Sequence, residues 1–464
     1  MNRIQVSIIL VEYANIYEFI ILFVQAIIVT EGIWENSMKQ MKIAIIGGGA
    51  SGIMAANIAA SAGGKVTIFE HKDRIGKKIL ATGNGKCNLS NLSFSCDYYY
   101  SEEEEGKIIA KKVFEQFPVS KTLEYFHDIG LITKEKSGYV YPYSEQATTV
   151  LDLLRNELAN NGVVIKQEVH VLSIQFKKDD NQYLIVTDLG NFQFDRLIIS
   201  CGGMANPQSG SDGSGYELAK KLGHNIIKPL PALVQLRCRE DYFKSINGVR
   251  CEATISTNIT NEITLSEFGE VQFTDYGISG IPVFQLSRHI VKYLQANKVI
   301  LVKIDFFPNM VKHDLEEKIR KRLDEDTYKN LTMEQLFIGF LNKKFVLLFI
   351  KLCGLKPDVK CNGIPWEKMK KMILLMKELE VTVYASNSFQ NAQVCSGGID
   401  MKQIKETLES KLMKGLYFSG EILDIDGRCG GYNLQWAWSS GYVAGMNAAE
   451  GESYVKNSAI KNES

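Results

Sequence analysis

Two kinds of apolar spacing follow each other in residues 41–70. Residues 43–46 form a short unbroken apolar run, which is typical of a buried parallel strand. Residues 54–62 carry apolar side chains at helical spacing, and Val66, Ile68 and Phe69 indicate a second strand. Gly63 and Gly64 separate the two, as expected at the end of a helix. The pattern predicts a strand, a helix and a second strand.

Glycines occupy the turn between the first strand and the helix. Gly47, Gly49 and Gly52 have the spacing G-x-G-x-x-G, which permits a tight turn, close approach of a pyrophosphate and close packing of the helix. The helix N-terminus offers unpaired N–H groups and a positive dipole end to phosphate. Glu70 follows the second strand and can accept a hydrogen bond from a ribose hydroxyl. These features together predict a dinucleotide site, and the alternative is a glycine-rich turn without a ligand.

Residues 71–91 are rich in Gly, Asn and Lys and lack apolar periodicity, which predicts a loop. A long loop here suits a ligand longer than a nicotinamide dinucleotide, with a ribityl chain and an isoalloxazine ring beyond the glycine turn. The amide and hydroxyl side chains that can bind a polyol or a flavin edge are Thr82, Asn84, Asn88 and Asn91, and the ammonium groups that can face phosphate are Lys77 and Lys78. A solvated surface loop is the alternative.

Two motifs carry a family resemblance. Residues 47–52, GGGASG, and residues 76–91, GKKILATGNGKCNLSN, resemble the three-domain bacterial flavoproteins of the aminoacetone oxidase family. That family includes a branch similar to bile-acid 4,6-reductases and is distantly similar to fumarate reductase flavoproteins. The resemblance implies non-covalent FAD and a small helical domain that covers the substrate entrance. It also places the backbone of Val171 against the adenine.

The pattern continues with helices and short strands up to residue 228. Residues 107–130 predict one amphipathic helix, and a second runs from a cap at Ser144 to about residue 161. Short strands, the later ones hairpin-like, follow in residues 163–194. Another apolar strand enters Gly202 and Gly203, and a helix begins near residue 212. Cys201, between that strand and the glycines, is interpreted as a packed thiol and not as a redox group, because no second cysteine is near in the sequence.

The middle of the chain changes character at about residue 229. Closely spaced strand patterns between residues 233 and 305 predict a barrel or sandwich, with a helix capped near Ser279. Residues 312–379 are almost wholly helical in pattern, and the apolar run 345–353 is expected to be buried between domains. Strand patterns return after residue 379, and Gly397 with Gly398 predicts a turn.

A closing motif occupies residues 415–449. Residues 416–418 predict a core strand, and Glu421 then lies at the carboxyl end of that strand, where its carboxylate can accept a ribityl hydroxyl. A glycine loop precedes a last helix whose N-terminus can face flavin N1 and O2 and stabilise the reduced ring. Gly441 and Gly445 are expected to let this helix pack closely on its neighbour. The two cofactor segments enclose an insertion.

The predicted fold class is therefore α/β, a Rossmann-like FAD-binding domain of the GxGxxG type with an inserted β-barrel-like domain and a small helical domain. The predicted parts are a FAD-binding domain at 41–228 and 393–450, a β-rich substrate domain at 229–308 and 379–392, a helical cover domain at 309–378 and a tail at 451–464. Residues 1–40 are interpreted as an N-terminal extension upstream of the native start, with an interfacial or membrane anchor as the alternative.

The composition bears on which partners the protein can have. The 53 basic residues balance the 53 acidic ones, which gives no support to a nucleic-acid partner. Nine cysteines without a CxxC pair indicate reduced thiols in a cytoplasmic protein. No metal site and no stable membrane insertion are predicted, and the oligomeric state stays open.

The predicted function is that of an FAD-dependent oxidoreductase, which transfers a hydride between a small organic substrate and flavin N5. The redox partner is O2 or NAD(P)H, so aminoacetone-type amine oxidation and reduction of a conjugated enone of the bile-acid type both fit. A flavin-bound redox sensor or interaction module without turnover is the alternative, and flavin-dependent RNA modification is less favoured by the neutral charge. No catalytic acid or base is assigned.

The site residues predicted by pattern or by resemblance fall into two sets. The cofactor set is Gly47, Gly49, Ala50, Ser51, Gly52, Glu70, Lys77, Lys78, Thr82, Gly83, Asn84, Gly85, Asn88, Val171, Gly202, Gly203, Gly420, Glu421, Gly431, Tyr432, Asn433 and Leu434. The weak catalytic candidates are Tyr141, Asp275, Tyr276 and Tyr432, and Asp275 stands where relatives often carry a histidine.

Overall fold

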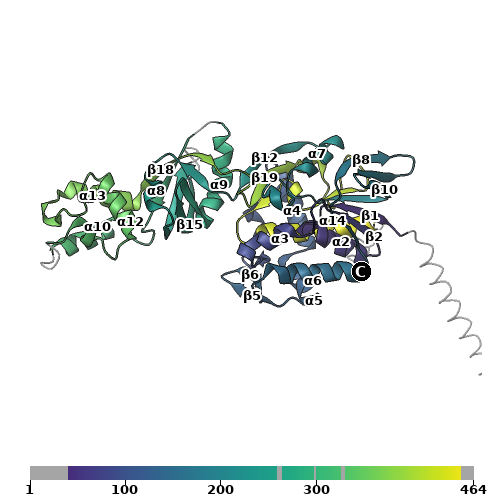
Figure 1. The fold of residues 1–464 in the computed structure, drawn as a ribbon, viewed down its shortest axis with the longest axis horizontal. Coiled ribbons are helices and arrows are strands. Elements are labelled where there is room, and N and C mark those ends of the chain that lie inside the picture. Colours follow the sequence, from purple (N-terminus) through teal and green to yellow (C-terminus); the bar gives the residue numbers. More distant parts are fainter. Residues whose placement is uncertain (1–39, 259–263, 297–298, 325–329, 451–464) are drawn as a thin grey trace, which may run out of the picture.

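Three parts lie in a row in the molecule (Figure 1). The computed structural model describes residues 40–258, 264–296, 299–324 and 330–450. An α/β part with strands β1 and β2 lies at one end, a barrel with strands β15 and β18 follows, and a helical part with α10, α12 and α13 forms the other end. The predicted N-terminal extension and C-terminal tail lie outside the described residues, apart from residue 40.

A five-stranded parallel sheet forms the centre of the α/β part. The strands, in sheet order, are β20 (Leu416–Phe418), β11 (Arg196–Ile199), β1 (Lys42–Ile46), β2 (Lys65–Phe69) and β7 (Val164–Lys166). The apolar run at 43–46 and the apolar residues Val66, Ile68 and Phe69 are buried in it, as predicted. A strand from near the C-terminus therefore completes a sheet that begins near residue 42.

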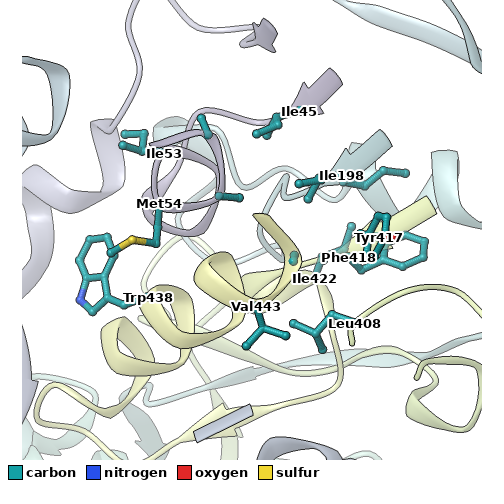
Figure 2. Close-up of a cluster of buried hydrophobic side chains, with 14 of the residues drawn as sticks. Ile45, Ile53, Met54, Ile198, Leu408, Tyr417, Phe418, Ile422, Trp438 and Val443 are labelled. Atoms are coloured by element: carbon teal, nitrogen blue, oxygen red, sulfur yellow. The ribbon is translucent and has the colours of Figure 1, made fainter. Parts of the chain in front are cut away.

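The helices α2 (Ala50–Ser61) and α14 (Tyr432–Glu450) pack against each other beside this sheet. Figure 2 shows Met54 of α2 beside Trp438 of α14, with Ile45 and Ile198 of the sheet close by. Residues 51–59 of α2 are all buried, so this helix is enclosed on every side.

Two glycines set the distance between α2 and α14. A Cβ at Gly441 would stand 2.5 Å from the carbonyl oxygen of Ser51, and one at Gly445 would stand 2.5 Å from that of Ala55. No side chain fits in such a gap, because Cβ contacts below about 3 Å do not occur in proteins. The close packing predicted from these two glycines is confirmed.

Three local predictions in the α/β part are wrong. Residues 71–91 are not wholly loop, because α3 (Lys77–Ala81) forms where Ile79 is buried. The single helix expected at 107–130 is two, α4 (Glu104–Gln116) and α5 (Val119–Asp128), because Pro118 has no N–H to continue the first. Ser144 does not cap α6 (Ala147–Asn160), whose N-cap is Gln146.

Smaller sheets surround the central one. The strands β8 (Val171–Lys177), β9 (Gln182–Thr187) and β10 (Gly190–Phe194) pair antiparallel, as predicted for hairpins. The remaining short elements are β3 (Ser90–Asn91), β4 (Tyr99–Tyr100), β5 (Thr133–Lys136), β6 (Tyr139–Pro142), α7 (Ser214–Lys221) and β21 (Asp426–Gly427). Strand β4 pairs with β21, which ties the region after the glycine loop to the closing motif.

The β-rich part is a closed barrel with the strand order β13-β16-β15-β14-β17-β18. Its strands are β13 (Leu236–Cys238), β14 (Arg250–Asn258), β15 (Thr264–Thr274), β16 (Gly277–Gly280), β17 (Ile300–Asp305) and β18 (Leu379–Ser386). Helix α8 (Phe243–Ile246) follows β13, and helix α9 (Ile281–Leu294) begins after Gly280. The predicted cap at Ser279 is wrong, because that residue lies inside β16 and is buried.

The helical part consists of α10 (Lys312–Asp324), α11 (Met333–Leu336), α12 (Lys343–Leu352) and α13 (Trp366–Lys377). Its apolar side chains belong to the same core as those of the barrel. Phe345 of α12 makes edge contacts with Phe273 of β15 and with Phe306, at ring-centroid distances of 4.8 Å in both cases. The apolar run predicted to lie between domains therefore fills the boundary between barrel and helices.

Two strands connect the barrel to the α/β part. Strands β12 (Ile226–Ala232) and β19 (Val394–Ile399) pair antiparallel. The turn predicted at Gly397 and Gly398 is wrong, because both lie inside β19. A Cβ at Gly397 would stand 2.6 Å from the Lys228 carbonyl oxygen, so the glycines serve a close backbone crossing. Across the described residues, no helix is both long and apolar enough to cross a membrane.

Because α14 and α2 are in such close contact, we expect a substitution that normally stabilises a helix to destabilise this protein. Gly445→Ala would stabilise an isolated helix by about 1 kcal/mol. Here its methyl group would meet the Ala55 carbonyl, so we expect a net loss of about 1–3 kcal/mol, as for other overpacked cores. Thermal unfolding of the purified protein measures this loss.

Gly363→Ala is the matched control, because no atom lies within 4 Å of its Cβ position and its φ is not positive. We expect that variant to unfold at the wild-type temperature. A Gly445→Ala protein as stable as wild type would show that α14 can move away from α2 at little cost.

Candidate functional site

A pocket opens at the carboxyl ends of β1, β2 and β11, where ligands bind in open α/β sheets. The predicted cofactor residues that line it are Gly47, Gly49, Ala50, Ser51, Glu70, Lys77, Lys78, Thr82, Val171, Gly202, Glu421, Asn433 and Leu434. The predicted residues outside its lining are Gly52, Gly83, Asn84, Gly85, Asn88, Gly203, Gly420, Gly431 and Tyr432. The structure thus brings the glycine turn and the closing motif together at one pocket.

The glycine turn leaves room for a ligand. The Gly47 N–H donates to the Phe69 carbonyl at 2.8 Å, and Gly47 has a φ of 101° that a side chain would strain. No atom lies within 4 Å of the Cβ position of Gly49. Helix α2 starts after Gly49 without a side-chain cap, so its first N–H groups are free for an anion. This end of the pocket fits a pyrophosphate.

Glu70 is fixed by backbone groups at the end of β2. Its Oε2 accepts from the Gly48 N–H at 2.9 Å, and its Oε1 accepts from the Lys72 N–H at 2.8 Å. The side chain is buried and lines the pocket. The carboxylate is therefore pre-oriented beside the glycine turn, where it suits a ribose hydroxyl.

Three residues that line the pocket near Glu70 were not predicted from the sequence. The rings of His71 and His170 stack with centroids 5.7 Å apart, and His71 Nε2 lies 4.0 Å from an Asp212 carboxylate oxygen. All three line the pocket beside Val171 of β8. Adjacency to Glu70 could have indicated His71, but no local pattern marks His170 or Asp212, because the fold alone brings them together.

Lys78 and Glu421 form an ion pair at the pocket wall. The Lys78 Nζ donates to Glu421 Oε2 at 2.7 Å, and Glu421 Oε1 accepts from the Cys395 N–H at 2.8 Å. Their side chains are 25% and 18% exposed, so the pair is shielded but reachable by a ligand. Both oxygens of Glu421 thus have protein partners, and a ribityl hydroxyl would have to share one of them with Lys78. Lys77 pairs instead with Asp73 at 2.6 Å.

The amides of the glycine loop serve the loop itself. Asn91 Nδ2 donates to the Gly430 carbonyl at 2.9 Å, and Asn91 Oδ1 accepts from the Ser93 N–H at 2.8 Å. With its amide turned so that both atoms find partners, Asn88 donates to the Ser90 carbonyl at 3.0 Å and accepts from the Gly431 N–H at 3.3 Å. These bonds fasten the loop to the start of α14, and neither amide lines the pocket.

The start of α14 is held by its own side chains. Asn433 Oδ1 accepts from the Gly427 N–H at 2.8 Å, and its Nδ2 donates to the Gly427 carbonyl at 2.9 Å. Tyr432 donates its hydroxyl to the Ser93 carbonyl at 3.0 Å. Burial raises the Tyr432 pKa to about 12, so the phenol stays neutral. Asn433 and Leu434 line the pocket, whereas Tyr432 braces the loop behind it.

The other catalytic candidates also lie outside the pocket lining. Tyr141 of β6 is half-buried, and burial raises its pKa. Asp275 is exposed, and Tyr276 accepts a hydrogen bond from Asn387 Nδ2 at 2.9 Å. No described residue is thereby marked as the acid or base of a reaction.

An ion pair from helix α9 links the barrel to the α/β part. Arg288 donates through Nε to Asp426 at 2.8 Å, with the two side chains only 10% and 2% exposed. Its guanidinium also lies 4.5 Å from the ring centroid of Tyr100. A buried ion pair of this kind specifies one orientation of its two elements, since removing one partner would leave an unpaired buried charge. The closing motif therefore holds α9, and with it the barrel, against the α/β part.

Comparison with known proteins gives a consistent family. The family model described as "HI0933-like protein Rossmann domain" matches residues 41–447. The chain is 42% identical to a 3-dehydro-bile acid delta(4,6)-reductase of Clostridium scindens over 88% of its own length and 99% of the relative. It is 30% identical to a ribosomal RNA dihydrouridine synthase of Haemophilus influenzae, over 87% of this chain and 97% of that one.

Among solved structures, a flavocytochrome c3 fumarate reductase in an open conformation aligns with this fold. The alignment has a TM-score of 0.42 and 15% identity, and it covers 91% of this chain and 80% of that chain. A likeness of this size adds nothing about the reaction.

The ion pair of Lys78 and Glu421 predicts a non-additive effect on FAD binding. Lys78→Met leaves the Glu421 carboxylate in the pocket wall without its counter-charge, and FAD is itself an anion. We expect FAD affinity to fall by roughly 10-fold or more. Glu421→Gln introduced into Lys78→Met should recover part of the loss, because it removes the like-charge repulsion. Fluorescence titration of apoprotein with FAD measures the affinities of the wild type, the two single variants and the double variant.

Lys86→Met is the control. Lys86 follows α3 in the chain and forms an exposed pair with Glu145 at 2.7 Å, and neither residue lines the pocket. If Glu421→Gln weakens FAD binding equally with and without Lys78, then Glu421 contacts the cofactor directly and the pair is not a charge-compensating unit.

Proposed function

This chain belongs to the HI0933-like family of Rossmann-domain proteins, and we propose that it is an FAD-dependent oxidoreductase that saturates a C=C bond conjugated to a carbonyl group. The observation that carries this proposal is the 42% identity to a 3-dehydro-bile acid delta(4,6)-reductase, spread over 99% of that relative. A second relative is named for making dihydrouridine, which also requires two hydrogens across a C=C bond beside a carbonyl. The reaction class is therefore supported by two relatives that differ in substrate.

FAD supplies hydride transfer at its ring N5 when bound. In our proposal the turn at Gly47 and Gly49 and the N-terminus of α2 hold the pyrophosphate, and Glu70 holds the adenosine ribose. Val171 would face the adenine, and the N-terminus of α14 would lie at the flavin ring, because both line the pocket. The positive end of the α14 dipole there would favour the reduced, anionic ring.

The electron donor in this proposal is NADH or NADPH. The described residues contain one parallel sheet with a glycine-rich turn of the G-x-G-x-x-G type, so the nicotinamide would reach the flavin from the open side of the pocket. Donor and substrate would then occupy that side in turn. Two electrons and one proton leave NAD(P)H as hydride, and a second proton comes from water to complete the saturated bond.

Ribosomal RNA is the second candidate substrate. Two relatives named as ribosomal RNA dihydrouridine synthases are 30% and 26% identical to this chain, which favours it. The balance of 53 basic and 53 acidic residues and the higher identity to the bile-acid reductase favour a small molecule. We therefore rank a small conjugated ketone first.

The thiols suit a reducing compartment. All nine cysteines are free, and burial raises the pKa of Cys87 and of Cys395 to about 12. Cys201 donates its thiol to the Ile46 carbonyl at 3.4 Å, and burial raises its pKa as well. Such thiols are poor nucleophiles. We accordingly propose a cytoplasmic protein whose cysteines play no redox part.

Anaerobic spectroscopy tests the proposed function. The purified holoprotein should be yellow, and NADH or NADPH should bleach its flavin absorbance under argon. A steroid 4,6-dien-3-one should then restore the absorbance, and mass spectrometry should find the product heavier by two hydrogens for each bond saturated. Protein that neither carries nor takes up FAD would contradict the proposal.

Parallel additions separate the alternatives in the same cuvette. Bleaching of oxidised flavin by aminoacetone alone would indicate an amine oxidase. Recovery of the absorbance by a uridine-containing ribosomal RNA fragment, and not by the dienone, would establish the second candidate. Flavin that no donor bleaches would indicate a sensor or interaction module without turnover.

A further inference from the structure

Arg237, in the barrel strand β13, is held in a fixed orientation by two neighbouring side chains. Arg237 of β13 donates through Nη1 to Asn387 Oδ1 at 3.0 Å, and its guanidinium lies 4.8 Å from the ring centroid of Tyr276. Asn387 Nδ2 in turn donates to the Tyr276 hydroxyl at 2.9 Å. The three side chains come from β13, from the turn between β15 and β16, and from the segment after β18. They hold the guanidinium plane in one orientation.

This arginine differs from Arg288 and Arg428, which are also half-buried, in having no carboxylate partner among the described residues. Arg288 pairs with Asp426 at 2.8 Å and Arg428 with Glu267 at 2.6 Å. Within the described ranges Arg237 pairs with no acidic side chain, and its one side-chain hydrogen bond goes to a neutral amide. A guanidinium carries five donors, so an oriented edge with at least two of them remains for an external partner. That geometry suits two-point binding of a carboxylate.

Backbone hydrogen bonds join the chain segment before Arg237 to the segment that reaches the pocket. The Asn387 N–H donates to the Gln235 carbonyl at 3.0 Å, and the Gln393 N–H donates to the Leu233 carbonyl at 3.3 Å. Gln393 and the residue after it line the pocket beside Glu421. The two connecting segments therefore run side by side from Arg237 to the pocket.

Apolar side chains flank part of this route. Leu233 and Val394 are buried together, with Phe284 of α9 packed against them. Phe389, which lies between Asn387 and the pocket-lining Gln393, packs against a neighbouring apolar cluster. A ligand that followed this route would present an apolar body to these residues and a negative group to Arg237.

We propose that Arg237, positioned by Tyr276 and Asn387, binds the carboxylate of an apolar substrate whose conjugated ring reaches the flavin end of the pocket. This assignment rests on the proposed function and narrows its substrate class to steroid-like carboxylic acids. A phosphate chain carries many negative charges and fits this place less well. Glu240 and Asp241 are close to the arginine in sequence, Asp275 precedes its neighbour Tyr276, and among the described residues no second cation joins the cluster. RNA is therefore an outcome of the test and not part of the proposal.

Equilibrium binding to the holoprotein tests the proposal without turnover. The probes are a saturated 3-keto steroid carboxylic acid and its methyl ester, followed by the change that each causes in the flavin spectrum. We expect wild-type protein to bind the acid roughly 10- to 100-fold more tightly than the ester, as a charge-assisted hydrogen bond allows. Arg237→Met should reduce this ratio to about one with little change for the ester, and Arg237→Lys should retain part of it because one charge remains.

Arg239→Met is the matched control, because Arg239 follows on the same chain segment and its side chain is exposed. It should keep the wild-type ratio. Tyr276→Phe removes the acceptor of Asn387 and should lower the ratio to an intermediate value. Unfolding temperature and FAD content are measured for each variant, and Arg237→Lys serves if Arg237→Met does not fold.

The outcomes separate this subsite from the reaction itself. An acid preference that survives Arg237→Met overturns the proposal, as does failure of both probes to bind wild-type protein. Binding of an RNA fragment that depends on Arg237 would assign the arginine to phosphate instead. Equal turnover of a dienone acid and its ester would leave the reductase intact and remove the subsite, whereas Arg237-dependent binding without turnover would leave the subsite and remove the reductase.

Discussion

The contact between α14 and α2 is the constraint on which the cofactor pocket depends. Helix α2 supplies the N-terminus beside the glycine turn, and α14 supplies the wall that faces it. The two helices can approach this closely only because Gly441 and Gly445 have no side chains to hold them apart. Gly420 makes the same accommodation, since a Cβ there would stand 2.9 Å from the Ser51 Cβ. Local backbone geometry thus decides where the two halves of the pocket meet.

What could be predicted from sequence follows the range of the interactions. The strand, turn and helix around Gly47 depend on neighbours within a few residues, so their pattern was sufficient. The pairing of Lys78 with Glu421 joins residues 343 positions apart, and nothing near either residue specifies it. His170 and Asp212 reach the pocket in the same way, through β8 and the loop before α7. Long-range contacts of this kind require the fold.

The errors have physical reasons of their own. The apolar pattern runs through Pro118 from Val113 to Phe126, so periodicity alone outweighed a residue that cannot continue a helix. Gly397 and Gly398 serve a close crossing of two backbones, for which glycine is as suitable as it is for a turn. Asn88 and Asn91 have the chemistry of ligand-binding amides, yet both the oxygen and the nitrogen of each amide are bonded to nearby backbone groups. The residue type shows which hydrogen bonds a side chain can make, but it does not show which partner the fold supplies.

The order in which the chain is made adds a consequence to the enclosed position of α2. Synthesis from the N-terminus produces β1 and α2 first and α14 last, with the barrel and the helical part in between. Because α2 is buried on all sides in the folded protein and is mostly apolar, its face toward α14 stays uncovered while roughly the next 370 residues emerge, which takes on the order of tens of seconds. The inserted parts share one core of their own and can fold during that interval. Production of this protein is therefore expected to depend on chaperones that shield the unfinished α/β part, and a chain that stops before residue 432 would leave that surface exposed permanently.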